Sequence, residues 1–90
     1  MLTAGRQRWP VSARGLRVGR SSKADAQLDD PHVSRLQVEL VQDGAALLVR
    51  ALESKNPTLV DGRPLAGEVR LEGREHTLQL GQTELRIGRE

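Results

Sequence analysis

Apolar residues in this 90-residue chain recur at every second position, in short runs that end at Gly, Asp, Asn or Pro. The alternation is clearest in residues 36–40 and 77–80, where one face of each run is apolar and the other is polar. A period of two is typical of β-strands with one buried face, whereas an amphipathic helix repeats every 3.6 residues. The pattern therefore predicts an all-β sandwich or barrel with little helix.

Nine segments have this strand-like pattern: residues 8–12, 16–18, 26–28, 36–41, 46–52, 58–60, 69–71, 76–80 and 84–87. Three dipeptides between them are typical of tight hairpin turns: Asp43-Gly44, Asp61-Gly62 and Gly81-Gln82. This close succession of short strands and turns leaves no room for crossover helices, which argues against a parallel α/β sheet. Residues 1–3 are few for a full first strand, so we expect the sheet edge there to be frayed or completed by a neighbour.

The composition bounds the size and class of the molecule. A chain of 90 residues that is 37% hydrophobic and 29% charged predicts one globular domain over residues 1–90. Trp9 is the only aromatic residue, which argues against nucleic-acid binders that stack bases on aromatic side chains. The net charge is only +2, and Arg and Glu are interleaved along the chain, so we expect no nucleic-acid partner.

The chain contains no cysteine, which excludes disulfides, cysteine-based zinc sites and thiol catalysis and favours a cytoplasmic location. No apolar run is long enough for a membrane span or a signal-peptide core, so we expect no membrane association. The ratio of 12 Arg to 2 Lys is typical of a GC-rich bacterial coding sequence.

Sequence motifs for catalysis are absent: there is no GxxxxGK[ST], HExxH, GxSxG or GxGxxG. The two histidines are interpreted as an exposed turn residue, His32, and a strand residue, His76. Ser34, His32 and one of several aspartates could form a catalytic set in principle, but nothing in the sequence shows that they meet. We therefore expect no enzyme, no catalytic residues, no metal and no cofactor.

Four segments with binding-type residues follow one another along the chain: residues 16–21, 28–37, 54–63 and 80–87. They contain Gly-Arg, then Leu-Asp-Asp-Pro-x-Val-Ser-Arg, then Asn-x-Thr-x-Val-x-Gly, then Leu-Gly-x-Thr-Glu-Leu. In order and spacing the set resembles the forkhead-associated (FHA) domain, an eleven-stranded β-sandwich that recognises phosphothreonine in partner proteins. The resemblance covers about residues 14–88. It implies an FHA-like sandwich of about ten to eleven short, mostly antiparallel strands.

The resemblance also implies roles for individual side chains. Arg20 reaches the phosphate from the loop after the third strand, Ser34 donates its hydroxyl to it, and Arg35 lies alongside. Lys55 can face the phosphate, and Asn56 holds the peptide main chain. These residue types suit a phosphoryl group, whose double negative charge and three acceptor oxygens favour a bidentate Arg, a Lys and a hydroxyl donor.

Gly19, Ser21 and Gln37 are expected to support this site. Gln37 stands where the family pattern Ser-x-x-His has histidine, a residue thought to brace the Ser loop from behind. Glutamine keeps a donor end and an acceptor end on a longer, more flexible stem, which predicts a weaker brace. Asn56-Pro57 replaces the family's Asn-Gly, and proline pushes the preceding residue toward extended geometry, so the direction of the Asn56 amide is left open.

Each of these residues also has a simpler interpretation. Gly19 can serve a turn with positive φ, Arg20 can be a solvated surface side chain, Ser34 can cap a turn, and Asn56 can be an ordinary loop residue. Together in the family's order they predict a phosphothreonine-binding module whose partner is a Thr-phosphorylated protein, linked to a Ser/Thr kinase.

Two alternatives remain open at this stage. One is an FHA-like scaffold or assembly domain that does not bind phosphate and uses a strand edge or an apolar patch instead. The other is a basic nucleic-acid binder, which strongly salt-dependent binding to bulk DNA would support.

Overall fold

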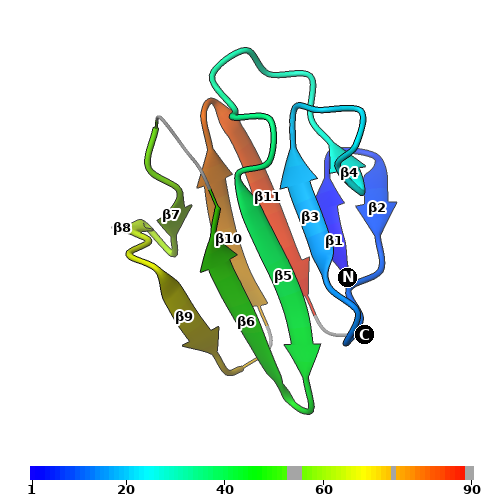
Figure 1. Cartoon of the computed structure of the whole chain (residues 1–90). Coiled ribbons are helices and arrows are strands. Elements are labelled where there is room, and N and C mark those ends of the chain that lie inside the picture. The colour runs from blue at the N-terminus through cyan, green and yellow to red at the C-terminus, as the bar shows by residue number, and fades with distance from the viewer. Residues whose placement is uncertain (53–55, 74, 89–90) are drawn as a thin grey trace.

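Two β-sheets pack face to face in the computed structural model, which describes residues 1–52, 56–73 and 75–88 (Figure 1). The first sheet has the order β2 (Gln7–Trp9), β1 (Leu2–Ala4), β11 (Thr83–Gly88), β10 (Glu75–Leu80), β7 (Leu59–Val60), β8 (Arg63–Pro64). The second sheet has the order β4 (Ala26–Gln27), β3 (Leu16–Gly19), β5 (Val38–Asp43), β6 (Ala46–Ala51), β9 (Glu68–Leu71). Among the strand pairs of the described residues, only β3 and β4 are parallel. The prediction of an all-β sandwich with mostly antiparallel strands is confirmed.

The core between the sheets is aliphatic. Inward positions alternate along the strands as predicted: Val38 and Leu40 on β5 are fully buried while Glu39 between them is partly exposed, and Leu78 and Leu80 on β10 are fully buried. Trp9, partly buried, packs against the edge of this core. The described residues include no helix that could span a bilayer.

The three predicted hairpin turns are present. Between β7 and β8, Asp61 and Gly62 both have positive φ, 50° and 82°, as a type I′ turn requires. Gly81-Gln82 connects β10 to β11. The turn between β5 and β6 is centred on Gly44-Ala45, one residue later than predicted, because Asp43 still pairs with Ala46 in the ladder.

The expectation of a frayed edge at the N-terminus is wrong. Strand β1 pairs with β11 on one side and with β2 on the other, so β2 is the edge strand. Leu2 is completely buried and lies opposite both Ile87 and Trp9. Three residues are sufficient here because both sides of β1 are hydrogen-bonded and its first side chain joins the core.

Strand β8 and several strand ends also differ from the prediction. The two residues of β8 are both exposed, so they carry no alternation by which the sequence could reveal them. Strand β2 ends at Trp9 and not at residue 12, since Pro10 has no N–H for the ladder. The strand predicted to start at residue 36 starts at Val38, because Leu36 and Gln37 belong to the loop before it.

The loops that carry the binding-type residues gather at one end of the sandwich. The β3–β4 and β4–β5 connections, the residues just before β7 and the β10–β11 turn all lie at the top of Figure 1, and the N-terminus and the end of β11 lie toward the opposite end. The sandwich thus brings together segments that are far apart in the sequence.

Candidate functional site

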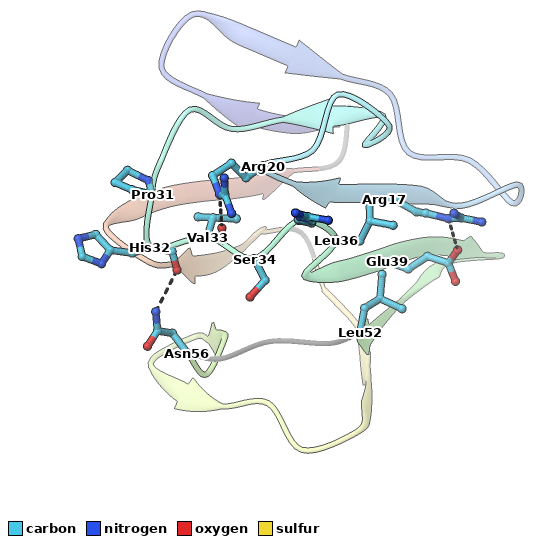
Figure 2. A pocket seen from close by; sticks show the side chains of 11 residues that line it. Arg17, Arg20, Pro31, His32, Val33, Ser34, Leu36, Glu39, Leu52 and Asn56 are labelled. Carbon is cyan, nitrogen blue, oxygen red and sulfur yellow. Dashed lines mark hydrogen bonds and ion pairs between the residues drawn. The ribbon is translucent and has the colours of Figure 1, made fainter.

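A groove with a volume of about 1020 Å³ opens between these loops (Figure 2). Four of the five predicted ligand-contacting residues line it: Arg20, Ser34, Arg35 and Asn56. The fifth, Lys55, lies outside the described residues. Three separate loops therefore supply the predicted residues to one concave surface.

The loops on one side of the groove are joined through their backbones. The amide of Arg20 donates to the Ser34 carbonyl and the amide of Ser21 to the Arg35 carbonyl, both at 3.0 Å. A Cβ on Gly19 would lie 2.6 Å from the Arg35 carbonyl carbon. Gly19 is therefore required by this close approach of two segments of the backbone. It has no positive φ, so the simpler interpretation of this glycine is wrong.

The Arg20 side chain is anchored at its Nε, which donates to the Val33 carbonyl oxygen at 3.0 Å (Figure 2). Within the described ranges, its Nη1 and Nη2 groups have no hydrogen-bond partner. The residue is exposed although its stem is held. This arrangement presents the guanidinium fork to the groove in a restricted orientation.

Gln37 braces the Ser34 loop from inside the protein. Its side-chain Oε1 accepts from the Ser34 amide at 3.0 Å, and its Nε2 donates to the Thr58 hydroxyl oxygen at 2.9 Å. Gln37 is completely buried and Thr58 is nearly so, at 4% exposed. Both ends of the amide are thus used to join the β4–β5 loop to the residues before β7. Sequence reasoning gave Thr58 no role, although it stands in the Asn-x-Thr motif.

Asn56 connects the two loops that face each other across the groove. Its Nδ2 donates to the His32 carbonyl oxygen at 3.0 Å. Ser34 lies two positions after His32 in the same loop. Asn56 and Ser34 face each other from opposite sides of the groove (Figure 2). The direction of the Asn56 amide, which the sequence left open, is toward the β4–β5 loop.

The two histidines occupy the positions expected for them. His32 is an exposed turn residue whose ring points away from Ser34 in Figure 2. His76 lies on β10, where its Nδ1 is 2.7 Å from an Asp61 carboxylate oxygen and its Nε2 is 2.8 Å from the Glu72 carbonyl oxygen. Among the described residues, no group of His, Cys, Asp and Glu could hold a metal ion.

Asp30 anchors the β4–β5 loop, a role that sequence reasoning missed. One carboxylate oxygen accepts from the His32 amide at 2.9 Å. The other accepts from the Gln82 amide at 2.9 Å and from the Thr83 hydroxyl at 2.7 Å. These bonds, first the one from Thr83 and then the one from His32, lower the pKa of the Asp30 carboxyl below its ordinary value. The carboxylate thus ties the binding loop to the β10–β11 turn in its ionised form.

The lowered pKa of Asp30 makes the stability of the fold depend on pH. The carboxylate stabilises the folded state fully above the ordinary value of 3.8, and this contribution is lost as the pH falls through the lower folded value. We expect the free energy of unfolding in urea to fall below about pH 4, and to fall less in Asp30→Asn. Asp61 is a second carboxyl with a lowered pKa, caused by the hydrogen bond from the Thr77 amide and then by His76. The variant Asp61→Asn therefore serves as a comparison for Asp30→Asn. If the free energy of unfolding of Asp30→Asn fell at acid pH as much as that of the wild type, this role of Asp30 would be contradicted.

Comparisons with known proteins identify the family. The sequence model of the FHA domain matches residues 16–88. The chain belongs to the FHA family. A comparison with curated protein sequences finds no match.

Solved FHA structures superpose over nearly the whole of this FHA domain. The FHA domain of FhaA, solved in complex with the intracellular domain of Rv3910, is 26% identical, with a TM-score of 0.78 over 96% of this chain and 97% of that one. An FHA domain from a structural and functional analysis of phosphothreonine-dependent FHA interactions is 27% identical, with a TM-score of 0.81 over 99% and 95%. The FHA domain of the CT664 protein from Chlamydia trachomatis is 25% identical, with a TM-score of 0.79 over 90% and 82%.

Proposed function

We propose that this FHA domain binds phosphothreonine peptides in the groove, with Arg20 and Ser34 as the phosphate ligands. The observation that carries the proposal is the Arg20 guanidinium, held at Nε by Val33 beside Ser34. A planar fork with one nitrogen already anchored loses little side-chain freedom when its remaining donors bind phosphate oxygens. Charge-assisted hydrogen bonds of this kind contribute roughly 1.5–3 kcal/mol each.

The other groove residues complete the proposed site. Arg35 adds positive charge beside the phosphate, and Asn56 holds the peptide main chain. Lys55 is proposed as a further phosphate contact on the resemblance alone. The similarity to FHA domains studied for phosphothreonine-dependent interactions supports these assignments.

The proposed partner is a Thr-phosphorylated protein, and the modification implies a Ser/Thr kinase acting on that partner. The domain itself acts as a binding module without catalysis. A phosphorylation-dependent interaction of this kind requires domain, partner and kinase in one compartment, which we propose is the cytoplasm.

The scaffold alternative has less support in the structure. No large hydrophobic side chain is exposed anywhere in the described part of the chain. A scaffold that docks through an apolar patch would need such side chains. The groove with its arginines is therefore the better candidate for the binding surface.

A titration of the intact domain with fluorescent phosphothreonine peptides of an oriented library tests the function. We expect saturable binding that disappears with the unphosphorylated peptides. Phosphoserine peptides should bind more weakly, since one methyl group discriminates by about 1–3 kcal/mol. A folded domain that binds no phosphopeptide would contradict the proposal and favour the scaffold alternative.

A further inference from the structure

The groove continues past the phosphate residues onto the outer face of the five-stranded sheet. Arg17 on β3 lines this end, separated from Asn56 at the other end by the phosphate residues (Figure 2). Leu36 and Leu52 contribute apolar surface between the Arg17 end and the Asn56 end of the groove. The proposed phosphate site leaves this part of the groove without a role.

Arg17 is only loosely held by its neighbours. Its Nε lies 3.8 Å from a Glu39 carboxylate oxygen, which is too long for a hydrogen bond, and its side chain is 57% exposed. Asp25, which is also close, uses its carboxylate to accept from the Arg17 backbone amide at 2.8 Å. The guanidinium of Arg17 can therefore turn toward a ligand without breaking a strong bond.

Glu39 is shared between two arginines. Its other carboxylate oxygen lies 3.6 Å from Arg50 Nη1, and Arg50 is hydrogen-bonded in turn to Glu68. The register places these four residues opposite one another across β3, β5, β6 and β9. Arg17 stands at the groove end of this charge row, and among the described residues its guanidinium has an ion pair with Glu39, which Arg50 shares.

The charges that line the groove are unequal. Among the described lining residues there are three arginines, Arg17, Arg20 and Arg35, and one carboxylate, Glu39. A dianionic phosphate balances Arg20 and Arg35, which leaves the Arg17 end cationic apart from its share of Glu39. A negatively charged group on the ligand complements this end.

We propose that Arg17 selects ligands that carry a second anionic side chain, a carboxylate or a phosphoryl group, near the phosphothreonine. This inference rests on the proposed phosphothreonine function. Arg17 lies on β3 and Arg20 is the first residue after that strand, so the two are three residues apart, and a nearly extended backbone covers about 10 Å over that separation. An extended peptide covers about 3.3 Å per residue, so the second anion lies about three residues from the phosphothreonine.

The test compares phosphothreonine peptides that carry Glu, phosphoserine, Gln or Lys at each position up to about four residues on either side. Fluorescence anisotropy with the intact domain measures the ratio of affinities for the anionic and the Gln peptide. We expect a ratio of about two- to fivefold at one or two positions, as for exposed ion pairs. The ratio should fall to about one in Arg17→Ala, and Arg17→Glu should prefer the Lys peptide. A ratio above one only in the phosphoserine arm would identify the anion as a second phosphate.

Arg86→Ala is the matched control. Arg86 is an exposed arginine on β11 whose Nε lies 3.7 Å from a Glu84 carboxylate oxygen, which resembles the Arg17 pair. Its removal changes the net charge equally, and we expect the ratio to stay at the wild-type value. The inference is overturned if Arg17→Ala still binds phosphothreonine peptides with an unchanged ratio. If the wild type binds no phosphothreonine peptide at all, the proposed function itself fails.

Discussion

Replacing Arg20 with alanine is expected to weaken phosphothreonine-peptide binding by more than about a hundredfold without unfolding the domain. The guanidinium has two Nη groups that can each donate to the phosphate, and losing two charge-assisted bonds of roughly 1.5–3 kcal/mol accounts for this loss. The fold should persist because the Arg20 side chain is exposed and, among the residues that the structure describes, its one hydrogen bond is to the Val33 carbonyl. Peptide titration measures the affinity, and urea unfolding measures the stability of the same variant.

One further variant at this position separates charge from geometry. Arg20→Lys keeps the positive charge but loses both the Nε anchor and the planar fork, so we expect only partial recovery of binding. Ser34→Ala removes the proposed hydroxyl donor and should also weaken binding. Arg86→Ala, on a strand away from the groove, should leave the affinity nearly unchanged. Wild-type affinity in a folded Arg20→Ala variant would refute phosphate binding at this site and support the scaffold alternative.

Replacing Gln37 with leucine is expected to lower the free energy of unfolding by about 2–6 kcal/mol. The substitution removes the acceptor of the Ser34 amide and the donor to the Thr58 hydroxyl, and a buried polar group left unpaired costs about 1–3 kcal/mol. Gln37 is fully buried, so water cannot replace the lost partners without a rearrangement of the loop. Urea unfolding of the variant and the wild type measures the difference.

A double-mutant cycle with Thr58→Val tests whether the two side chains act as a pair. Valine has nearly the shape of threonine and lacks the hydroxyl that accepts from Gln37 Nε2. If the bond matters, the double variant should lose less stability than the two single variants added together. Strict additivity, or a Gln37→Leu variant within about 0.5 kcal/mol of the wild type, would show that the brace contributes little.

The strands and turns were predictable because their signals are local. The alternation in residues 77–80 identifies β10, and Asp61-Gly62 identifies a tight turn, since each depends on only a few neighbouring residues. Strand β8 carries no such local signal, because both of its residues are exposed and its pairing follows from the turn before it. The inner position of β1 follows from its partner β11, which lies at the other end of the chain.

The family motifs, which follow a fixed order, also indicated which residues gather in one groove, and ligand binding by these residues stays a proposal. Arg20, Ser34, Arg35 and Asn56 line one groove as that order implied. The residues that hold the loops in place were harder to find. Asp30 bonds to Thr83, 53 positions later in the sequence, and no local pattern indicates that contact.

The sequence by itself determined the class of fold, the places where the chain turns and the set of residues suited to a phosphate. These properties follow from the alternation of side chains and from the backbone preferences of a few turn residues. The tertiary structure alone decided that Gln37 meets Thr58, that Asp30 meets Thr83 and that Arg17 shares Glu39 with another arginine. Such contacts depend on which strands become neighbours and in what register, and that choice is made by burial of the whole core at once.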